Sequence, residues 1–503
     1  MKNNYSTWVP FIGFTLFIVA VFFFFGFHKI FFSNPQGVHF MRQTDSLSFV
    51  SQYFNNKNSF FNPQLFNLAN ENAKAASEFP IIYYLTALIY QIVGNKPFIL
   101  KLIHLIISYV GVYYIFKLCY MWLKDYFYAS LITLFLFTST VFNYYSFNYL
   151  PDISALGFTF IGWYFAFKYL STPTKKSLLI GLLFFTLASL IKVTYFLNPI
   201  ALIVFILFSY LKKSKSDKEI KIKPVVIFGL ISVFLVLSWN LYMIYYNKIN
   251  ASSSFIYYPL PIWNLSSYEI SQVWEHMSDY WYASYFAHSS FHFLFAIILL
   301  QILFIKKSDF KLSGIITILL IGMISYYLLF YSQFKVHDYY FLAFIPLFIL
   351  MLINGISILQ KLIKKKFFHY LVKIALLIIV ISGINYSKMK LEDRYDKRIN
   401  SYSSIGFLID ENKNAIEELD IKQSAKFIVA PDKTPNGGLF FLNRMGWTIK
   451  DSNEITVENI AHFKQLGAEY LLIASENQKT LSKGEQAGEK IFDGKGISIF
   501  KLD

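Results

Sequence analysis

Residues 80–93 read PIIYYLTALIYQIV, an apolar run that forms either a short membrane span or a helix lying flat on the membrane. The choice decides the fold, because each crossing moves every later loop to the other side of the bilayer. A helical span needs about 20 residues, more than this run offers. Pro80 suits the first turn of a helix, and Tyr83, Tyr84 and Tyr90 suit headgroup depth. The run itself therefore favours an interfacial helix.

The surrounding chain has the composition of a polytopic membrane protein. Its 503 residues are 55% hydrophobic, 20% aromatic and only 15% charged. The first apolar run, 8–32, is too long for a typical signal peptide and lacks a small-residue cleavage site, so we expect a retained helix. Apolar runs of spanning length predict eleven membrane helices, at about 8–32, 98–118, 127–147, 153–170, 177–191, 195–211, 225–246, 291–305, 312–331, 337–360 and 369–386.

Lysine placement supports the flat orientation of 80–93. With the N-terminus inside and eleven crossings, every inside loop is rich in lysine, as the positive-inside rule requires. If 80–93 crossed, all of these loops would lie outside. The net charge of +16 therefore reflects membrane topology and not a nucleic-acid partner. The inside lysines are Lys117, Lys124, Lys168, Lys175, Lys176, the six in KKSKSDKEIKIK (212–223), Lys306, Lys307, Lys311, Lys361, Lys364, Lys365 and Lys366.

The composition changes at residue 387, where the chain becomes polar and charged. We therefore predict two domains, a membrane domain over 1–386 and a small extracytoplasmic α/β domain over 387–503. The second should contain strands at 425–431, 469–475 and 496–502, and helices at 400–418 and 456–466, the latter capped by Thr456. The one cysteine, Cys119, excludes an intramolecular disulfide and a Cys-based metal site.

Three carboxylates fall on the predicted outer face. The first outer loop, 33–97, holds Asp45 three residues after Arg42, and Glu78 in the sequence SEFP. Asp152 follows Pro151 at the mouth between two later helices. Helix capping is the ordinary alternative for Asp45 and Asp152, and a favourable charge at a helix N-terminus is the alternative for Glu78.

Cations also gather on this face. Lys192, in SLIKVTYF, lies outside against the charge bias, so it either reaches the headgroups or binds an anion such as a lipid phosphate. Another group of ionisable and aromatic residues begins the helix at 337–360; it comprises Lys335, His337, Asp338, Tyr339 and Tyr340.

The long outer loop at 247–290 is rich in aromatic residues, with FIYYPLPIW followed by SQVWEHMSDYWYASYF. An anchor belt at the membrane interface is one interpretation. The other is a mobile flap over a lipid-linked substrate.

Carboxylates, cations and aromatic residues on one membrane face suit sugar transfer from a polyprenyl phosphate. Cations stabilise the charge of the phosphate leaving group, and a carboxylate takes the proton of the attacking hydroxyl. No nucleotide need cross the membrane, in keeping with the absence of a Gly-rich phosphate loop from the sequence.

The order RQTD (42–45), EFP (78–80), PD (151–152), LIK (190–192) and HDYY (337–340) resembles that of polytopic GT-C glycosyltransferases. It is most similar to bacterial members of the dolichyl-phosphate-mannose protein mannosyltransferase superfamily, which includes the aminoarabinose transferase of lipid A. The resemblance covers about residues 1–386. It implies a GT-C fold of about eleven membrane helices, with juxtamembrane helices in the loop 33–97.

The resemblance also implies an inverting reaction and site residues. Asp45 is the candidate base, with Glu78 and Asp152 as further candidate catalytic groups. Arg42, Lys192 and His337 are candidates for binding the donor phosphate, and Lys335, Asp338, Tyr339 and Tyr340 for lining the substrate cavity. Protein-modifying members carry an Asp-Glu pair where this chain has Asp45 and Ser46, which argues against a protein acceptor.

The predicted partners are a polyprenyl-phosphate sugar, a lipid, glycan or protein acceptor, and membrane lipids. The predicted location is the inner or plasma membrane. No cofactor is required, and a divalent metal stays an open alternative, although no spacing demands one.

A lipid-linked-sugar flippase and a polysaccharide ligase or polymerase are the rival functions. A flippase should line a path through the membrane with polar residues, and a ligase should carry an Arg-rich outer loop.

Overall fold

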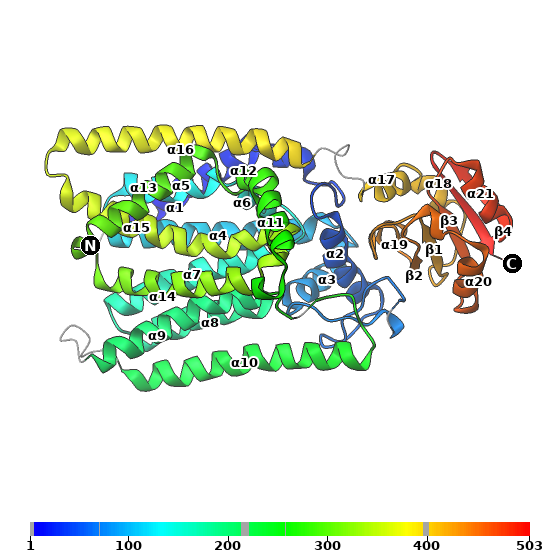
Figure 1. Cartoon of the computed structure of the whole chain (residues 1–503), viewed down its shortest axis with the longest axis horizontal. Coiled ribbons are helices and arrows are strands. Elements are labelled where there is room, and N and C mark those ends of the chain that lie inside the picture. Colours follow the sequence, from blue (N-terminus) through cyan, green and yellow to red (C-terminus); the bar gives the residue numbers. More distant parts are fainter. Residues whose placement is uncertain (1–4, 70, 213–220, 257, 396–401, 503) are drawn as a thin grey trace. The chain divides into compact units, whose positions relative to one another are not determined.

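A computed structural model describes residues 5–69, 71–212, 221–256, 258–395 and 402–502 (Figure 1). Contacts divide the chain into two compact units. The membrane unit contains Met1–Phe31, Lys101–Asn240 and Tyr258–Asp393, and the second unit contains Phe32–Leu100, Leu241–Tyr257 and Arg394–Asp503. The first outer loop thus belongs to the same unit as the C-terminal α/β domain. The lysine-rich loop predicted at 212–223 falls mostly outside the described residues.

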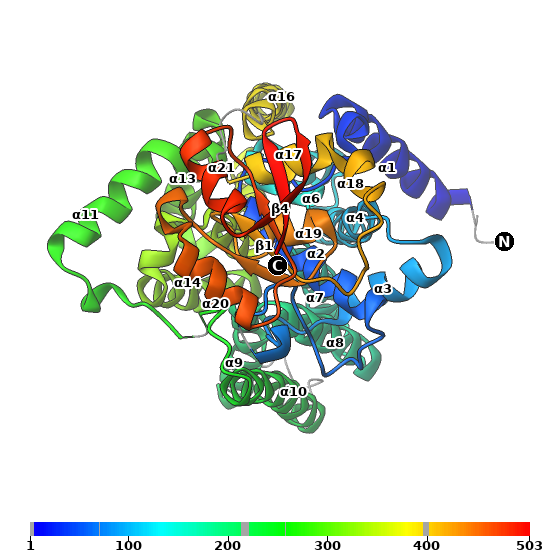
Figure 2. The same ribbon diagram turned by 90° about the vertical axis from the view of Figure 1, so that its right-hand side faces the viewer.

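The membrane unit is built from long helices that run alongside one another (Figure 1). Helices α9 and α10 lie side by side in both views (Figure 1, Figure 2). The helices are α1 (Tyr5–Phe24), α4 (Phe98–Leu123), α5 (Tyr126–Phe135), α6 (Thr140–Ser146), α7 (Asp152–Ser171), α8 (Lys175–Ile191), α9 (Leu197–Leu211), α10 (Ile222–Ile249), α11 (Ser267–His276), α12 (Tyr282–Tyr285), α13 (His288–Leu303), α14 (Phe310–Leu329), α15 (Ile345–Leu362) and α16 (Lys366–Arg394).

A multi-pass membrane protein is confirmed, since seven helices among the described residues are long and apolar enough to cross a bilayer. The number rises to nine if each of two bent helix pairs is one span. Each of the eleven predicted segments contains a helix. The two that fall outside this count are α1, of which only Ile12–Phe24 was counted, and α8, which has 17 residues.

Three predicted helices have different ends or shapes. The segment predicted as one helix over 127–147 bends by 82° at Ser139, whose backbone is extended and whose side chain caps α6. The helix predicted over 8–32 ends at Phe24, because Gly26 adopts a left-handed conformation with φ of 73°. The regular helix predicted from 337 begins only at Ile345, after a 3-10 segment.

Close glycine packing holds α7, the helix that begins at Asp152. A Cβ atom on Gly157 would lie 2.6 Å from the carbonyl oxygen of Ile107, and one on Gly111 would lie 2.6 Å from the Gly157 backbone. The backbones of α4, which contains Ile107 and Gly111, and α7, which contains Gly157, therefore touch, as small residues allow in membrane helices. This packing fixes the position of the N-terminus of α7.

The second unit contains the predicted juxtamembrane helices, α2 (Phe40–Asn55) and α3 (Ile81–Val93). Helix α3 has 13 residues, too few for a span, and begins directly after Pro80 as expected. Its exposed side chains form an apolar stripe at helical spacing, comprising Leu85, Leu88, Ile89 and Ile92.

Two of the three tyrosines of α3 pack against α2. Tyr83 stacks on Phe49 of α2 with ring centroids 5.5 Å apart, and Tyr90 meets Phe54 of the same helix at 5.9 Å. Both tyrosines are buried. These two side chains therefore pack against α2, and the depth of the three tyrosines in the membrane stays a prediction.

The C-terminal part of the second unit is a mixed α/β domain around a five-stranded sheet of order β2-β1-β3-β5-β4. Strand β1 pairs in parallel with β2 and β3, and β5 pairs in antiparallel with β3 and β4. The strands are β1 (Phe427–Ala430), β2 (Gly446–Thr448), β3 (Tyr470–Ile473), β4 (Gly488–Gly494) and β5 (Ile497–Leu502). The helices are α17 (Ser404–Glu411), α18 (Lys413–Glu417), α19 (Gly437–Leu442), α20 (Val457–Gln465) and α21 (Gln478–Glu485).

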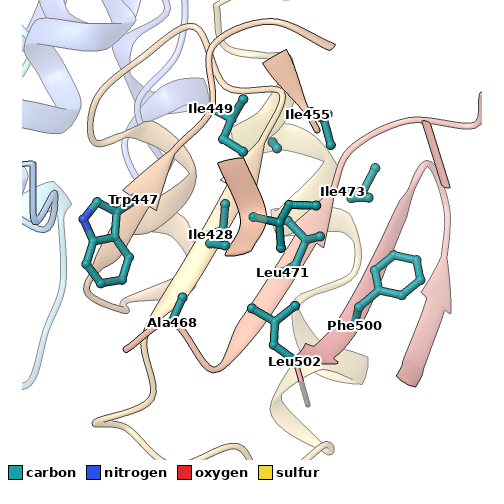
Figure 3. Packing of buried hydrophobic residues seen from close by; sticks show 11 residues of the cluster. Ile428, Trp447, Ile449, Ile455, Ala468, Leu471, Ile473, Phe500 and Leu502 are labelled. Carbon is teal, nitrogen blue, oxygen red and sulfur yellow. The ribbon is translucent and has the colours of Figure 1, made fainter. Parts of the chain in front are cut away.

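The three predicted strands are confirmed as β1, β3 and β5, and the two predicted helices as α17–α18 and α20. The first two residues of the predicted helix 400–418 lie outside the described residues. Thr456 caps α20 as expected, accepting a hydrogen bond from the backbone of Asn459. Ile428, Leu471 and Phe500, one from each of the three predicted strands, lie in one apolar core (Figure 3).

Candidate functional site

Helix α2 carries Arg42 and Asp45 one turn apart. The helix begins at Phe40, after His39 in a left-handed conformation with φ of 57°. Asp45 therefore lies in the second turn of α2, beyond the position from which a side chain can cap it. The capping interpretation of Asp45 is wrong, and its burial needs another reason.

That reason is a buried ionic cluster in the second unit, which we call the Arg42 cluster and define as Arg42, Asp45 and Glu78. One Arg42 nitrogen donates to both Glu78 oxygens, at 3.1 and 3.3 Å. Its other terminal nitrogen lies 3.5 Å from Asp45 Oδ2. Arg42 also stacks 5.1 Å above the ring of Phe255. One guanidinium thus holds the two carboxylates that the sequence places 33 residues apart.

Hydroxyl groups complete the environment of Glu78. Ser77 and Tyr83 both donate short hydrogen bonds to its carboxylate. The backbone of Ala76, just before this segment, exchanges two hydrogen bonds with the Asn247 amide, at 2.7 and 2.8 Å. Glu78 is therefore held by two neutral hydroxyl donors and by the Arg42 guanidinium.

Asp45 is held more loosely and is more fully desolvated. Asn436 donates to its Oδ1 at 2.8 Å, and Arg42 faces its Oδ2. Burial raises the pKa of Asp45, with Glu78 adding to the rise, against the opposing effects of Arg42 and Asn436. A buried carboxyl group with a raised pKa suits a group that accepts a proton during a reaction.

A second cluster, in the membrane unit, joins Asp152 at the start of α7 to Lys192 at the end of α8. Lys192 Nζ lies 3.2 Å from Asp152 Oδ1, and also 5.1 and 4.9 Å from the ring centroids of Tyr339 and Tyr340. We call Asp152, Lys192, Tyr339 and Tyr340 the Lys192 cluster. The Lys192 side chain keeps 21% of its surface exposed, whereas that of Asp152 keeps 4%, so the cation is the part that a ligand can reach.

Local backbone geometry places the Lys192 side chain beside Asp152. Helix α8 ends at Ile191, and Lys192 turns to an extended conformation while its N–H still bonds to Ala188. Asp152 is in the first turn of α7 and pairs with Lys192, so it has a role beyond capping. Tyr195, just after α8, donates to the Asp152 carbonyl at 3.3 Å.

Two other predicted residues lie beside the Lys192 cluster. Asp338 is fully buried and accepts a hydrogen bond of 2.6 Å from Tyr145, which the sequence did not single out. The ring of His337 lies 5.1 and 5.4 Å from those of Tyr339 and Tyr340. These contacts fix the segment that presents both tyrosines to Lys192.

Lys335 has a different environment, although it is close in sequence. Its ammonium group donates to Gln272 of α11 at 2.9 Å, and its carbonyl accepts from Trp281. It therefore supports the aromatic outer loop rather than the Lys192 cluster.

That loop borders an apolar pocket of about 470 Å³ within the membrane unit. Helix α11 begins with a capping box between Ser266 and Glu269, so the loop has regular structure. Aromatic side chains from α11–α15 line most of the pocket, including Trp274, Tyr282, Tyr285, Phe291, Phe341 and Phe348. The composition suits a long apolar ligand.

Among the described residues, no three His, Cys, Asp or Glu side chains gather closely enough to hold a metal ion. The two carboxylates of the Arg42 cluster share a guanidinium. The metal requirement of the chain stays a prediction.

Apart from Lys335, the residues predicted from the sequence thus form two groups, each within its own unit. Asn436 and Tyr145 were missed because neither belongs to a motif and each reaches its carboxylate from a distant part of the sequence. The run PNGG at 435–438 indicates a turn, but gives no sign that its asparagine contacts Asp45.

Comparison with known proteins shows the fold and a family match over part of the chain. Residues 76–239 match the model of the dolichyl-phosphate-mannose-protein mannosyltransferase family. No curated protein sequence matches the chain. The fold is similar to that of ArnT from Cupriavidus metallidurans bound to undecaprenyl phosphate, with a TM-score of 0.61 and 11% identity over 98% of each chain.

It is also similar to the archaeal oligosaccharyltransferase AglB from Archaeoglobus fulgidus, in complex with an inhibitory peptide and a dolichol-phosphate. The TM-score is 0.56 and the identity 10%, over 94% of this chain and 70% of AglB. At such identities the likeness concerns the fold. The resemblance predicted from the sequence motifs is confirmed. The chain has an ArnT-like GT-C fold, and its residues 76–239 match the dolichyl-phosphate-mannose-protein mannosyltransferase family of membrane glycosyltransferases.

Proposed function

We propose that this protein transfers a sugar from a polyprenyl-phosphate donor to an extracytoplasmic acceptor, with inversion at the anomeric carbon. The observation that carries the proposal is the Arg42 cluster, in which a buried carboxylate of raised pKa lies beside a guanidinium and a second carboxylate. The family match, which includes Glu78, Asp152 and Lys192, supports the same chemistry.

In the proposed step, the acceptor hydroxyl oxygen attacks the anomeric carbon and the bond from that carbon to the phosphate oxygen breaks. Asp45 takes the hydroxyl proton, and polyprenyl phosphate leaves with the bonding electrons. Glu78 keeps Arg42 in place, and through Arg42 it orients Asp45. General-base assistance of this kind contributes about 10²–10⁴ in rate.

Cations stabilise the departing phosphate. We assign this role to Lys192, assisted by His337, since Lys192 is the part of its cluster that is open to a ligand. Asp152 and the faces of Tyr339 and Tyr340 hold the ammonium group in position. Arg42, the third residue predicted to bind the phosphate, holds Asp45 and Glu78 within its own unit.

The aromatic pocket supports a lipid-linked donor. Its apolar lining suits the isoprene units of a polyprenyl chain, and the loop that contains α11 borders it as a flap would. Lys335 then serves to hold this loop. If the organism is bacterial, as the richness in Lys, Asn, Ile and Phe suggests, the donor lipid is undecaprenyl phosphate.

The acceptor we favour is a lipid or a glycan. Where protein-modifying relatives carry a second acid, this chain has Ser46, whose hydroxyl donates to the Arg42 carbonyl at 3.0 Å and contacts Tyr83 at 3.1 Å. Ser46 thus supports the cluster and leaves Asp45 as the one acid of the motif.

The proposal includes the topology: eleven crossings of the cell membrane, the N-terminus inside and the C-terminal domain outside. Lys124→Cys, in a Cys119→Ala background, should react with an impermeant maleimide only after cells are opened. Cys119 is the one native cysteine, so this background leaves position 124 as the single thiol. Tyr268→Cys, which replaces an exposed side chain of α11, is the matched control and should react in intact cells. Labelling of position 124 from outside would contradict this topology.

The function is tested with purified protein in liposomes, radiolabelled polyprenyl-phosphate sugars and a membrane-lipid extract. The expected result is label in an acceptor and one polyprenyl phosphate released for each sugar transferred. Movement of intact donor across the bilayer, without release, would favour the flippase. Transfer only from a pyrophosphate-linked oligosaccharide would favour the ligase or polymerase.

A further inference from the structure

Asn436 lies in the loop PDKTPNGG (431–438), which connects β1 to α19 in the C-terminal domain. The amide nitrogen of Asn436 donates to Asp45 Oδ1 at 2.8 Å, and only 1% of the residue is exposed. The C-terminal domain thus supplies a direct hydrogen bond to the carboxylate that we propose as the base.

The orientation of the Asn436 amide is fixed by its other bonds. Its oxygen accepts from the backbone N–H groups of Phe66 and Asn67, at 3.2 and 3.1 Å. Only the NH₂ group can then face Asp45, because an amide has one oxygen and one nitrogen. The donor is thereby aimed at Asp45 Oδ1, and Asp45 Oδ2 is left facing Arg42.

The loop that presents Asn436 is itself rigid. Asp432 accepts from the backbone of Thr434 and Gly438, both at 2.8 Å, and from the Thr434 hydroxyl at 2.7 Å. Gly437 lets the loop approach α2 closely, since a Cβ atom there would lie 2.8 Å from the ring of Phe40. A preorganised donor on a rigid loop costs little entropy when it orients a carboxylate.

We propose that Asn436 is a positioning residue through which the C-terminal domain orients Asp45 for proton transfer. This inference rests on the proposed function. It differs from simple docking of the domain, which Asn67 also supports by donating to the Pro435 carbonyl at 2.6 Å. Asn67 makes no contact with Asp45 among the hydrogen bonds described, so it serves as the matched control.

The test is the pH dependence of the transfer rate. The charged groups that act on Asp45 are Arg42 and Glu78. Tyr83 of α3 bonds to Glu78, and Asp432 lies in the loop that presents Asn436, where burial raises its pKa to about 6. Asn436→Asp keeps an oxygen for the two backbone donors but replaces the NH₂ group by a like charge. Since the Asn436 bond lowers the pKa of Asp45, its loss should move the acidic limb of the rate profile to higher pH.

We expect Asn436→Asp to lower kcat about tenfold or more at neutral pH, to shift the acidic limb upward by about one pH unit, and to leave the donor KM unchanged. Asn67→Ala should leave the limb in place. Should Asn436→Asp not fold, Asn436→Ala replaces it, with the same expected direction.

An unmoved limb in an active Asn436 variant would overturn the inference while leaving the proposed function intact. Unfolding of both Asn436 variants, with Asn67→Ala folded, would equally overturn it, because the residue would then be structural. Absence of transfer in the wild-type protein is a failure of the proposed function. In that event the protonation midpoint of Asp45 is measured by infrared difference titration of the wild-type protein and of Asn436→Ala. The carboxyl absorption band of Asp45 is identified by its loss in Asp45→Asn. A midpoint that does not rise would overturn the inference.

Discussion

Asp45→Asn should reduce sugar transfer by about 10²–10⁴-fold, with donor affinity nearly unchanged. The reason is that the substitution removes the group that accepts the proton while preserving the shape of the side chain. The Asn436 amide donates to Asp45 Oδ1, and the amide oxygen of an asparagine at position 45 can accept the same bond. The measurement is the initial rate of transfer alongside donor binding.

Glu78→Gln is the matched comparison, because it neutralises the other carboxylate on Arg42. Ser77 and Tyr83 donate to Glu78, and a glutamine oxygen can still accept from them. We expect a smaller loss of rate than in Asp45→Asn, since Glu78 acts through Arg42. Full transfer by Asp45→Asn would move the base to Glu78 or Asp152 and contradict the assignment.

The second large effect is expected at Lys192. Lys192→Met alone would leave Asp152 as an unpaired buried carboxylate, which typically destabilises a protein by about 3–5 kcal/mol. The informative variant is therefore Lys192→Met combined with Asp152→Asn, which removes both charges together. We expect its donor KM to rise, and its transfer rate to fall, by about 10²-fold, because the phosphate loses a charge-assisted hydrogen bond worth about 1.5–3 kcal/mol.

Lys335→Met is the control for this pair. It removes a cation that is close in sequence but binds Gln272 of α11. Its donor KM should change much less than that of the double variant. Equal effects at the two lysines would mean that the overall charge of the outer face matters and that the Lys192 cluster has no special role.

The membrane helices could be predicted because each one depends on a run of apolar residues that are neighbours in the sequence. A long apolar run forms a helix in a bilayer, since a helix satisfies the backbone hydrogen bonds within the segment itself. The ends of those helices were less certain, because single residues set them: Gly26 ends α1, and Ser139 breaks the segment 127–147. The strands β2 and β4 were missed because one is three residues long and the other is polar along most of its length.

By itself, the sequence determined the class of the protein, the short helix within 80–93, the α/β domain and the identity of most candidate site residues. Only the tertiary structure decided which of them act together. Arg42 binds Glu78 and Asp45, Asp152 binds Lys192, Lys335 goes elsewhere, and Asn436 reaches Asp45 across 391 positions of the chain. The physical reason is that apolar burial follows from the pattern of neighbouring residues. Pairing between buried polar groups depends on geometry that forms only when distant segments pack.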